Sequence, residues 1–272
     1  MERLEAALQK ARQERQQPRP EAEPGASPAD LPAADGSPWE MLREGRITPR
    51  WGRRNRIVAL NQGRESAAYD LLRSRTLRIM GENGWKRLAI TSPNKTCGKT
   101  TVTANLAFSL SRQLDLRILA LDFDLRRPAL HRLLGHRPAH SLHEVLAGER
   151  PFEDAFIRFG SNLAFGLNRA PARNPSELLQ SKRARQKLDE LQRIFRPDLI
   201  LFDMPPMLAS DENIGFLPAV DCALLIGAAD STTISQLDIC EKELADLTGV
   251  LGIVLNKCRF TDTDSGYDYE YY

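Results

Sequence analysis

The chain has 272 residues, a length that suits one α/β domain with a tail or two small domains. Its net charge of +2 is too small to indicate nucleic acid or an anionic membrane as the main partner. The cysteines form no Cys-x-x-Cys pair and lack zinc spacing, so we expect reduced thiols in a cytosolic protein. The charged N-terminus and the absence of a long apolar run predict neither a signal peptide nor a transmembrane helix.

The N-terminal quarter of the chain carries weak structural signals. Residues 1–16 predict a short helix, because apolar residues recur there at helical spacing. Residues 17–64 predict a linker rich in Pro, Ala and Glu, which we expect to be disordered, followed by a transitional segment. We therefore expect the folded domain to begin near residue 65.

From residue 65 onward, short apolar strands alternate with amphipathic helices. Such alternation is typical of a parallel sheet that is covered by helices on both faces. The expected fold class is a doubly wound, mostly parallel α/β domain over residues 65–260. The predicted strands are 87–91, 117–123, 199–202, 222–226 and 250–255, and the predicted helices are 66–80, 100–113, 175–195 and 232–247.

A phosphate-binding loop is predicted between the first of these strands and the next helix. The backbone amides of such a loop bind phosphate oxygens, and Gly98 would let the backbone approach closely. Lys99 would place a cation on the β- and γ-phosphates, and Thr100 would offer a hydroxyl to Mg²⁺. Pro93 stands where the pattern G-x-x-x-x-G-K-[ST] has its first glycine, so a chance Gly-Lys-Thr before an ordinary helix is the alternative.

Acidic residues follow two of the predicted strands. Asp122 and Asp124 are two residues apart at one strand end, so their side chains point to the same side. Asp203 follows the apolar run at 199–202, as a Walker B acid does. Carboxylates at the carboxyl ends of neighbouring parallel strands can position Mg²⁺ beside a phosphate loop. The alternative is that each aspartate is only a turn or cap residue.

The motif order resembles the bacterial tyrosine kinases (BY-kinases) of capsule and exopolysaccharide systems. The Asp-x-Asp-x-Arg element separates that family from most other P-loop ATPases, and the resemblance covers about residues 64–259. The matching segments are S-P-x-x-x-C-G-K-T-T at 92–101, L-D-x-D-L-R-R-P at 121–128 and F-D-M-P-P at 202–206, with shorter fragments at 141–148, 174–179 and 252–256.

This resemblance implies a P-loop fold of the ParA/MinD type that binds ATP and Mg²⁺. Asp122 and Asp124 would form the Walker A′ element, and one of them would help the attacking tyrosine lose its proton. Thr100, Asp122 and Asp203 would hold Mg²⁺, while Lys99 and the three aspartates would form the catalytic set. The remaining nucleotide-binding residues implied are Cys97, Gly98, Thr101, Arg126 and, at the adenine, Asn256.

The tail at 261–272 holds four of the five tyrosines: Tyr267, Tyr269, Tyr271 and Tyr272. The segment is short and acidic, so we expect it to be mobile and able to bring a hydroxyl to an active site. The family carries such a cluster and phosphorylates it on neighbouring copies. The alternative is an acidic aromatic tail that only docks on a partner.

Two departures from the family pattern bear on activity and assembly. Thr96 stands where the family usually has a glycine, and a phosphate loop often needs positive φ there. In the helix at 66–80, Arg75 and Arg78 fit the family's oligomerisation motif Glu-x-x-Arg-x-x-Arg, but Leu72 replaces the glutamate. Asp70 with Arg73 is an alternative register that lacks the final arginine.

The resemblance implies a cytoplasmic protein-tyrosine autokinase that regulates exopolysaccharide polymerisation or export. Implied partners are a membrane protein of the chain-length-regulator type as activator, a counteracting tyrosine phosphatase, and further copies of the chain in a ring or dimer. No nucleic acid is expected, and the activator would recruit the chain to the inner face of the membrane. The alternatives are a ParA/MinD-like ATPase switch and an ATP-binding regulatory protein without kinase turnover.

Overall fold

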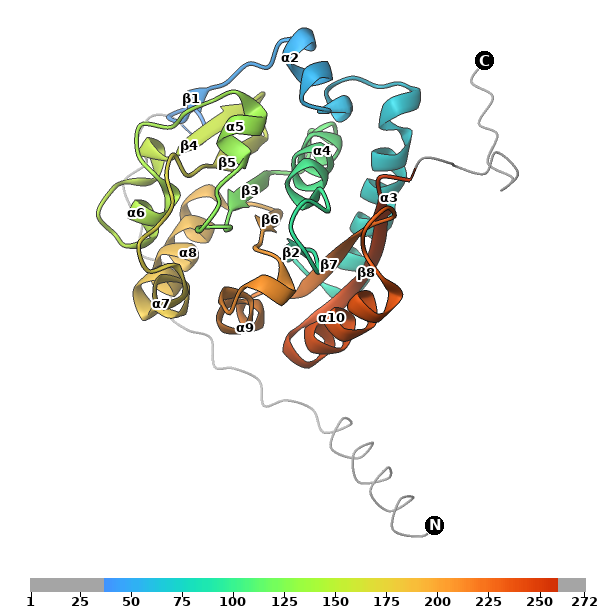
Figure 1. Cartoon of the computed structure of the whole chain (residues 1–272). Helices are drawn as coiled ribbons and strands as arrows, with labels where there is room; N and C mark the ends of the chain where they lie inside the picture. Colours follow the sequence, from blue (N-terminus) through green and yellow to red (C-terminus); the bar gives the residue numbers. More distant parts are fainter. Residues whose placement is uncertain (1–36, 259–272) are drawn as a thin grey trace. The chain divides into compact units, whose positions relative to one another are not determined.

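A mostly parallel sheet runs through the part of the chain that the structure, a computed structural model, describes, residues 37–258 (Figure 1). Its strand order is β1-β4-β5-β3-β6-β2-β7-β8, and every neighbouring pair is parallel except β4 and β5. The strands are β1 Arg43–Glu44, β2 Arg87–Thr91, β3 Ile118–Asp122, β4 Phe156–Phe159, β5 Leu163–Gly166, β6 Leu199–Asp203, β7 Cys222–Ala228 and β8 Gly249–Asn256.

Helices cover both faces of this sheet, as a doubly wound fold requires (Figure 1). Strand alternation sends Ile118 into one hydrophobic core and Leu119 into the other. The core that contains Ile118 is closed by α3 Ala67–Asn83, α4 Lys99–Ser111 and α5 Leu130–Leu134. The opposite core is closed by α6 Leu142–Leu146, α7 Pro175–Gln180, α8 Lys182–Phe195, α9 Glu212–Phe216 and α10 Ile234–Leu247.

The predicted fold class is thus confirmed. The short helices α5, α6 and α9 were not predicted, and three larger differences follow. The single helix predicted at 175–195 is two helices, because Ser181 is extended and its hydroxyl accepts the Ala184 N–H at 3.1 Å to start α8. The antiparallel pair β4–β5 was not predicted from the sequence. Within the described residues, no helix is both long and apolar enough to cross a bilayer.

The third difference is the start of the domain, which lies near Ser37 rather than at residue 65. Trp39 is buried, and its indole N–H donates to the Phe195 carbonyl at 2.8 Å. Trp51, in α2 Pro49–Arg54, donates to the Leu133 carbonyl at 2.9 Å. Two large aromatic anchors therefore fix the segment that was expected to be transitional. The predicted helix at 1–16, most of the predicted linker and the tail at 261–272 lie outside the described residues.

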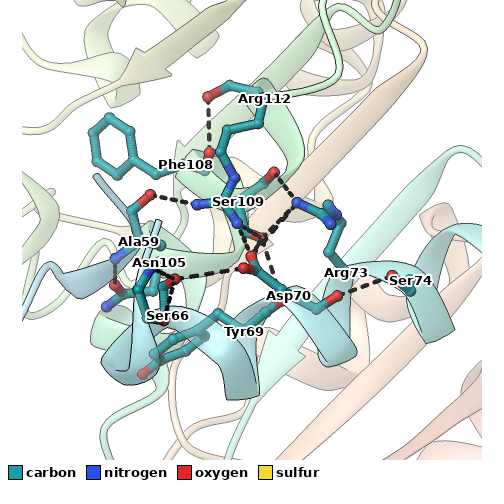
Figure 2. Close-up of polar contacts among 12 residues, drawn as sticks. Ala59, Ser66, Tyr69, Asp70, Arg73, Ser74, Asn105, Phe108, Ser109 and Arg112 are labelled. Carbon is teal, nitrogen blue, oxygen red and sulfur yellow. Dashed lines mark hydrogen bonds and ion pairs between the residues drawn. The ribbon is translucent and has the colours of Figure 1, made fainter. Parts of the chain in front are cut away.

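A network of polar side chains joins α3 to α4, the helix that follows the phosphate loop (Figure 2). At its centre, the Asp70 carboxylate accepts the Ser109 hydroxyl at 2.7 Å and pairs with the guanidinium groups of Arg73 and Arg112. Arg112 also reaches the Ala59 carbonyl at 3.1 Å. Both arginine side chains are four-fifths covered, so one carboxylate offsets two largely buried cations.

Asp70 and Arg73 form the alternative register considered for the oligomerisation motif. In the structure both residues take part in a contact within the chain instead. Leu72, at the position of the family's glutamate, packs against the core below α3. Arg75 is exposed, and Arg78 pairs with Glu82 on its own helix at 3.1 Å.

Replacing Asp70 with alanine is expected to lower the free energy of unfolding by about 2 kcal/mol, because Arg73 and Arg112 would lose their counter-charge. Urea denaturation measures this change. The matched control is Glu82→Ala on the same helix, whose exposed pair with Arg78 should contribute under about 0.5 kcal/mol. Equal effects of the two substitutions would show that the network is not stabilising.

Candidate active site

The phosphate loop begins at the carboxyl end of β2, near the middle of the sheet, and leads directly into α4. Gly98 has φ +92, and a Cβ placed there would lie 2.3 Å from Asn256 Nδ2. Asn256, at the end of β8, donates from Nδ2 to the Cys97 carbonyl at 2.8 Å. Only glycine fits position 98, and the end of β8 is held against the loop.

Thr96 also has positive φ, at +66, as anticipated from the family's glycine at this position. It is the only β-branched residue among the described non-glycine residues with positive φ. The left-handed conformation costs a residue with a Cβ about 1 kcal/mol relative to glycine. The loop therefore keeps its conformation with threonine in place, at some cost in stability.

Thr96→Gly is expected to raise the free energy of unfolding by about 1 kcal/mol and to leave Mg-ATP affinity equal or tighter. Thermal denaturation and nucleotide titration test this. In contrast, Ser74→Gly in the exposed interior of α3 should lower stability by about 0.5 kcal/mol. A destabilised Thr96→Gly protein would mean that the threonine side chain supports the loop.

Lys99 and the three predicted aspartates come together at the carboxyl edge of the sheet. Asp122 and Asp203 lie directly opposite each other at the ends of the neighbouring strands β3 and β6. Lys99 Nζ lies 2.9 Å from Asp124 Oδ2 and 3.5 Å from Asp203 Oδ1. All four side chains are buried. The strand-end acids and the loop lysine thus form one cluster.

The charges of this cluster are incompletely balanced. Burial raises the pKa of the Asp122 carboxyl well above its usual range, and the facing Asp203 raises it further. Burial also raises the pKa of Asp203, although Lys99 opposes this shift. Burial alone lowers the pKa of Lys99, but Asp203 and Asp124 outweigh it, so the net shift is upward. One ammonium therefore faces three carboxyl groups.

Several carboxylate oxygens of the cluster lack hydrogen-bond partners. Asp122 Oδ2 accepts the N–H groups of Ala129 and Leu130 at 3.1 Å each, while its Oδ1 accepts none. Neither carboxylate oxygen of Asp203 has a hydrogen bond of ordinary geometry within the described residues, although Lys99 Nζ lies 3.5 Å from Oδ1 and the Thr100 side chain adjoins the carboxyl. Buried polar atoms of this kind are normally satisfied, so free oxygens here fit a divalent cation and its waters.

The other predicted nucleotide-binding residues take varied positions. The Thr100 side chain adjoins Asp203 and lowers the pKa of that carboxyl. Thr101 lies in the first turn of α4. Cys97 is buried, with its sulfur 3.6 Å from the Thr232 hydroxyl, so its main chain rather than its thiol lines the loop. Arg126 turns away toward α9, where it pairs with Glu212 at 2.6 Å and with Asp211 at 3.0 Å.

Sequence reasoning missed the polar side chains that hold the cluster in place. Asn168 is fully buried and donates from Nδ2 to the Asp122 carbonyl at 2.7 Å. Thr91 and Asn213 both donate to the Pro205 carbonyl, at 2.7 Å and 3.0 Å, which fixes the turn after Asp203. Asn168 follows β5, so only a correct prediction of that strand would have placed this residue beside Asp122. The four tail tyrosines lie outside the described residues.

A family model described as the CobQ/CobB/MinD/ParA nucleotide binding domain matches residues 88–268. The chain belongs to this family. The family is described as nucleotide-binding. This agrees with a phosphate loop beside carboxylate oxygens that lack hydrogen-bond partners.

Curated proteins similar in sequence to this chain are named tyrosine-protein kinases, which confirms the resemblance to bacterial tyrosine kinases. The chain is 29% identical over 221 residues to the putative tyrosine-protein kinase AmsA of Erwinia amylovora and 31% identical over 204 residues to the tyrosine-protein kinase etk of Escherichia coli K12. It spans only 30% and 28% of those proteins. It is 29% identical to the putative tyrosine-protein kinase CapB of Staphylococcus aureus and spans 87% of it.

Solved structures agree with these relatives. The kinase domain of Escherichia coli tyrosine kinase ETK matches with a TM-score of 0.63 and 28% identity, over 76% of this chain and 80% of that domain. The cell division ATPase MinD of Pyrococcus furiosus matches with a TM-score of 0.53 and 28% identity, over 65% of this chain and 74% of that protein.

Proposed function

We propose that this chain is a protein-tyrosine autokinase that transfers the γ-phosphoryl group of ATP to tyrosines of its own tail. The observation that carries this proposal is the cluster of Lys99 with Asp122, Asp124 and Asp203 beside the phosphate loop. Mg-ATP supplies the phosphoryl group, and its cation offsets the charge that develops during transfer.

Each residue of the cluster then has a distinct role. The main-chain amides from Cys97 onward would bind phosphate oxygens. The Lys99 ammonium would bind them as well, after it gives up its contact with Asp124. Thr100, Asp122 and Asp203 would hold Mg²⁺, because the two carboxyl groups have free buried oxygens. Asn256 would contact adenine from the edge of the loop, where it already lies.

The Walker A′ carboxylates would act on the acceptor. A tyrosine hydroxyl must lose a proton as it attacks, and a carboxylate with a raised pKa is a better base than an ordinary aspartate. Asp122 lies beside the proposed Mg²⁺ position, and Asp124 becomes available when Lys99 moves to the phosphates. One of these two groups would accept the proton from Tyr267, Tyr269, Tyr271 or Tyr272.

By analogy with its relatives, the chain would regulate exopolysaccharide or capsule polymerisation and export. Its partners would be a membrane chain-length regulator as activator, a counteracting tyrosine phosphatase and further copies of the chain. The activator would hold the kinase at the cytoplasmic face of the membrane. Because Asp70, Leu72 and Arg73 are committed to contacts inside the domain, assembly through α3 would rest on Arg75 and on Arg78.

An ATPase switch is the second candidate, since the MinD fold is shared. The test is incubation of the full chain with Mg-ATP, with and without the cytoplasmic segment of the partner, followed by mass mapping of phosphotyrosine. A kinase labels the tail, and replacing all four tail tyrosines with phenylalanine removes the label without weakening ATP binding. A switch hydrolyses ATP and labels no tyrosine, which would reject the proposal.

A further inference from the structure

Three exposed arginines, Arg127, Arg169 and Arg173, lie on the two segments that follow β3 and β5. Arg127 follows β3, and the other two lie in the segment after β5. Because β3 and β5 are parallel neighbours, both segments leave the sheet at the edge that carries the acid cluster.

Two hydrogen bonds bring these segments into direct contact beside the acids. Asn168 Nδ2 donates to the Asp122 carbonyl at 2.7 Å, and the Ala172 N–H donates to the Leu125 carbonyl at 2.9 Å. Arg169 and Arg173 each adjoin one of these anchored residues. Their main chains are thus positioned relative to the proposed site of phosphoryl transfer.

None of the three arginines forms an ion pair with a described residue, unlike their neighbour Arg126, although the Arg169 guanidinium donates to the Ala139 carbonyl at 2.7 Å. The carboxylates around them are mostly engaged, since Asp124 pairs with Lys99, and Asp211 and Glu212 pair with Arg126. Glu177 is the remaining acid in a hollow of about 370 Å³ that Arg126 and Arg173 also line. The border of the site therefore carries surplus positive charge.

We propose that Arg127, Arg169 and Arg173 form a docking surface for the acidic tyrosine tail of this chain, an inference that rests on the proposed kinase function. The tail at 261–272 contains four carboxylate side chains, Asp262, Asp264, Asp268 and Glu270, and no lysine or arginine. Guanidinium groups pair with carboxylates and also stack on tyrosine rings. Charge and side-chain type therefore match on the two sides.

The length of the tail permits this docking. The last described residue, Cys258, lies two residues beyond Asn256, which contacts the phosphate loop. β8 and β3 are four strand positions apart, or about 19 Å at the usual strand spacing. The nine residues from Cys258 to Tyr267 span up to about 30 Å when extended. The tail is therefore long enough to reach the acids of its own chain, and a neighbouring copy would offer the same acidic segment to the same arginines.

These arginines would select the acceptor and take no part in the chemical step. Their loss should slow tail phosphorylation and leave nucleotide binding and basal ATP hydrolysis unchanged. The interaction should also weaken with salt, because exposed ion pairs are screened.

A charge-swap cycle on the full chain tests this surface. Arg169→Glu with Arg173→Glu is expected to slow phosphotyrosine formation about tenfold, and Asp268→Lys with Glu270→Lys should slow it similarly. Combining the two pairs should restore most of the rate, which a merely structural role of the arginines would not do. Arg173→Lys should remain near wild type. Arg185→Glu with Arg193→Glu is the matched control and should have no effect, because these exposed arginines of α8 form no ion pair with a described residue.

An additive loss in the combined variant, or an unchanged rate in the arginine variant, would overturn the docking surface. Fluorescence anisotropy with a labelled peptide of residues 261–272 reads docking without catalysis. The arginine pair variant should bind this peptide about tenfold more weakly than wild type. A wild-type chain that binds the peptide but labels no tyrosine would reject the kinase proposal alone, whereas equal affinity of both proteins would reject the docking surface alone.

Discussion

Replacing Lys99 with methionine is expected to abolish Mg-ATP binding and to lower the free energy of unfolding by about 3 kcal/mol. The ammonium is the only cation within 4 Å of Asp124 and Asp203 among the described residues, so its loss leaves buried carboxylates without a counter-charge. Phosphate oxygens would lose their side-chain cation at the same time. Titration calorimetry and urea denaturation measure the two effects.

The stability loss should depend on pH with a defined sign. The raised pKa values of Asp122 and Asp203 mean that the folded protein binds these protons more tightly than the unfolded chain. Such groups contribute stability at low pH, and that stability is lost as the pH rises through the folded-state pKa. Without Lys99 both pKa values should rise further, so the deficit relative to wild type should be larger at pH 8 than at pH 5.

Lys86→Met is the matched control for this prediction. Lys86 is exposed and precedes β2 at the opposite end of the strand from the phosphate loop. Its replacement should change stability by less than about 0.5 kcal/mol and leave ATP binding intact. A Lys99→Met protein that is as stable as wild type at pH 8 would contradict the electrostatic description of the cluster.

Asp122→Asn is expected to lower the rate of phosphoryl transfer about 100-fold to 1000-fold while stabilising the nucleotide-free protein by about 1 kcal/mol. An amide of the same shape can keep accepting the Ala129 and Leu130 N–H groups through its oxygen. It removes one of two facing buried carboxyl groups, and with it the repulsion from Asp203. It also removes a metal ligand and a candidate base.

The pH dependence again follows from the raised pKa of Asp122. Wild type loses stability as the pH rises through that value, and the asparagine variant loses only the part that comes from Asp203. The stabilising effect should therefore be larger at pH 8 than at pH 5 in denaturant titrations. Asp115→Asn, an exposed position before β3, serves as control and should alter neither stability nor rate. A destabilised Asp122→Asn protein with full kinase activity would contradict both assigned roles.

The centre of the fold was predictable from the sequence because its strands are continuously apolar and end in polar residues with a known chemistry. The segment 87–91 is a strand with those bounds. The strands predicted at 117–123 and 199–202 end in the structure at Asp122 and Asp203, which lie side by side. The need for positive φ at Thr96 followed from the family's glycine and was confirmed by its backbone. Local pattern and motif therefore sufficed near the phosphate loop.

The periphery was less predictable because its order depends on distant contacts. β4 and β5 have four residues each, and Arg158 interrupts the apolar run of β4. Trp39 lies in a polar, proline-rich region, and its burial against Phe195 depends on a helix more than 150 residues away. The pairing of Arg126 with Glu212 likewise joins segments 86 residues apart, so no local pattern could reveal it.

Titration calorimetry with ATP, in the presence and absence of Mg²⁺, tests the central claim most directly. The acid cluster beside the phosphate loop predicts one site per chain whose affinity rises strongly with Mg²⁺ and is lost in Lys99→Met. An absence of binding heat in the wild-type chain, or binding that is indifferent to both Mg²⁺ and Lys99, would contradict it.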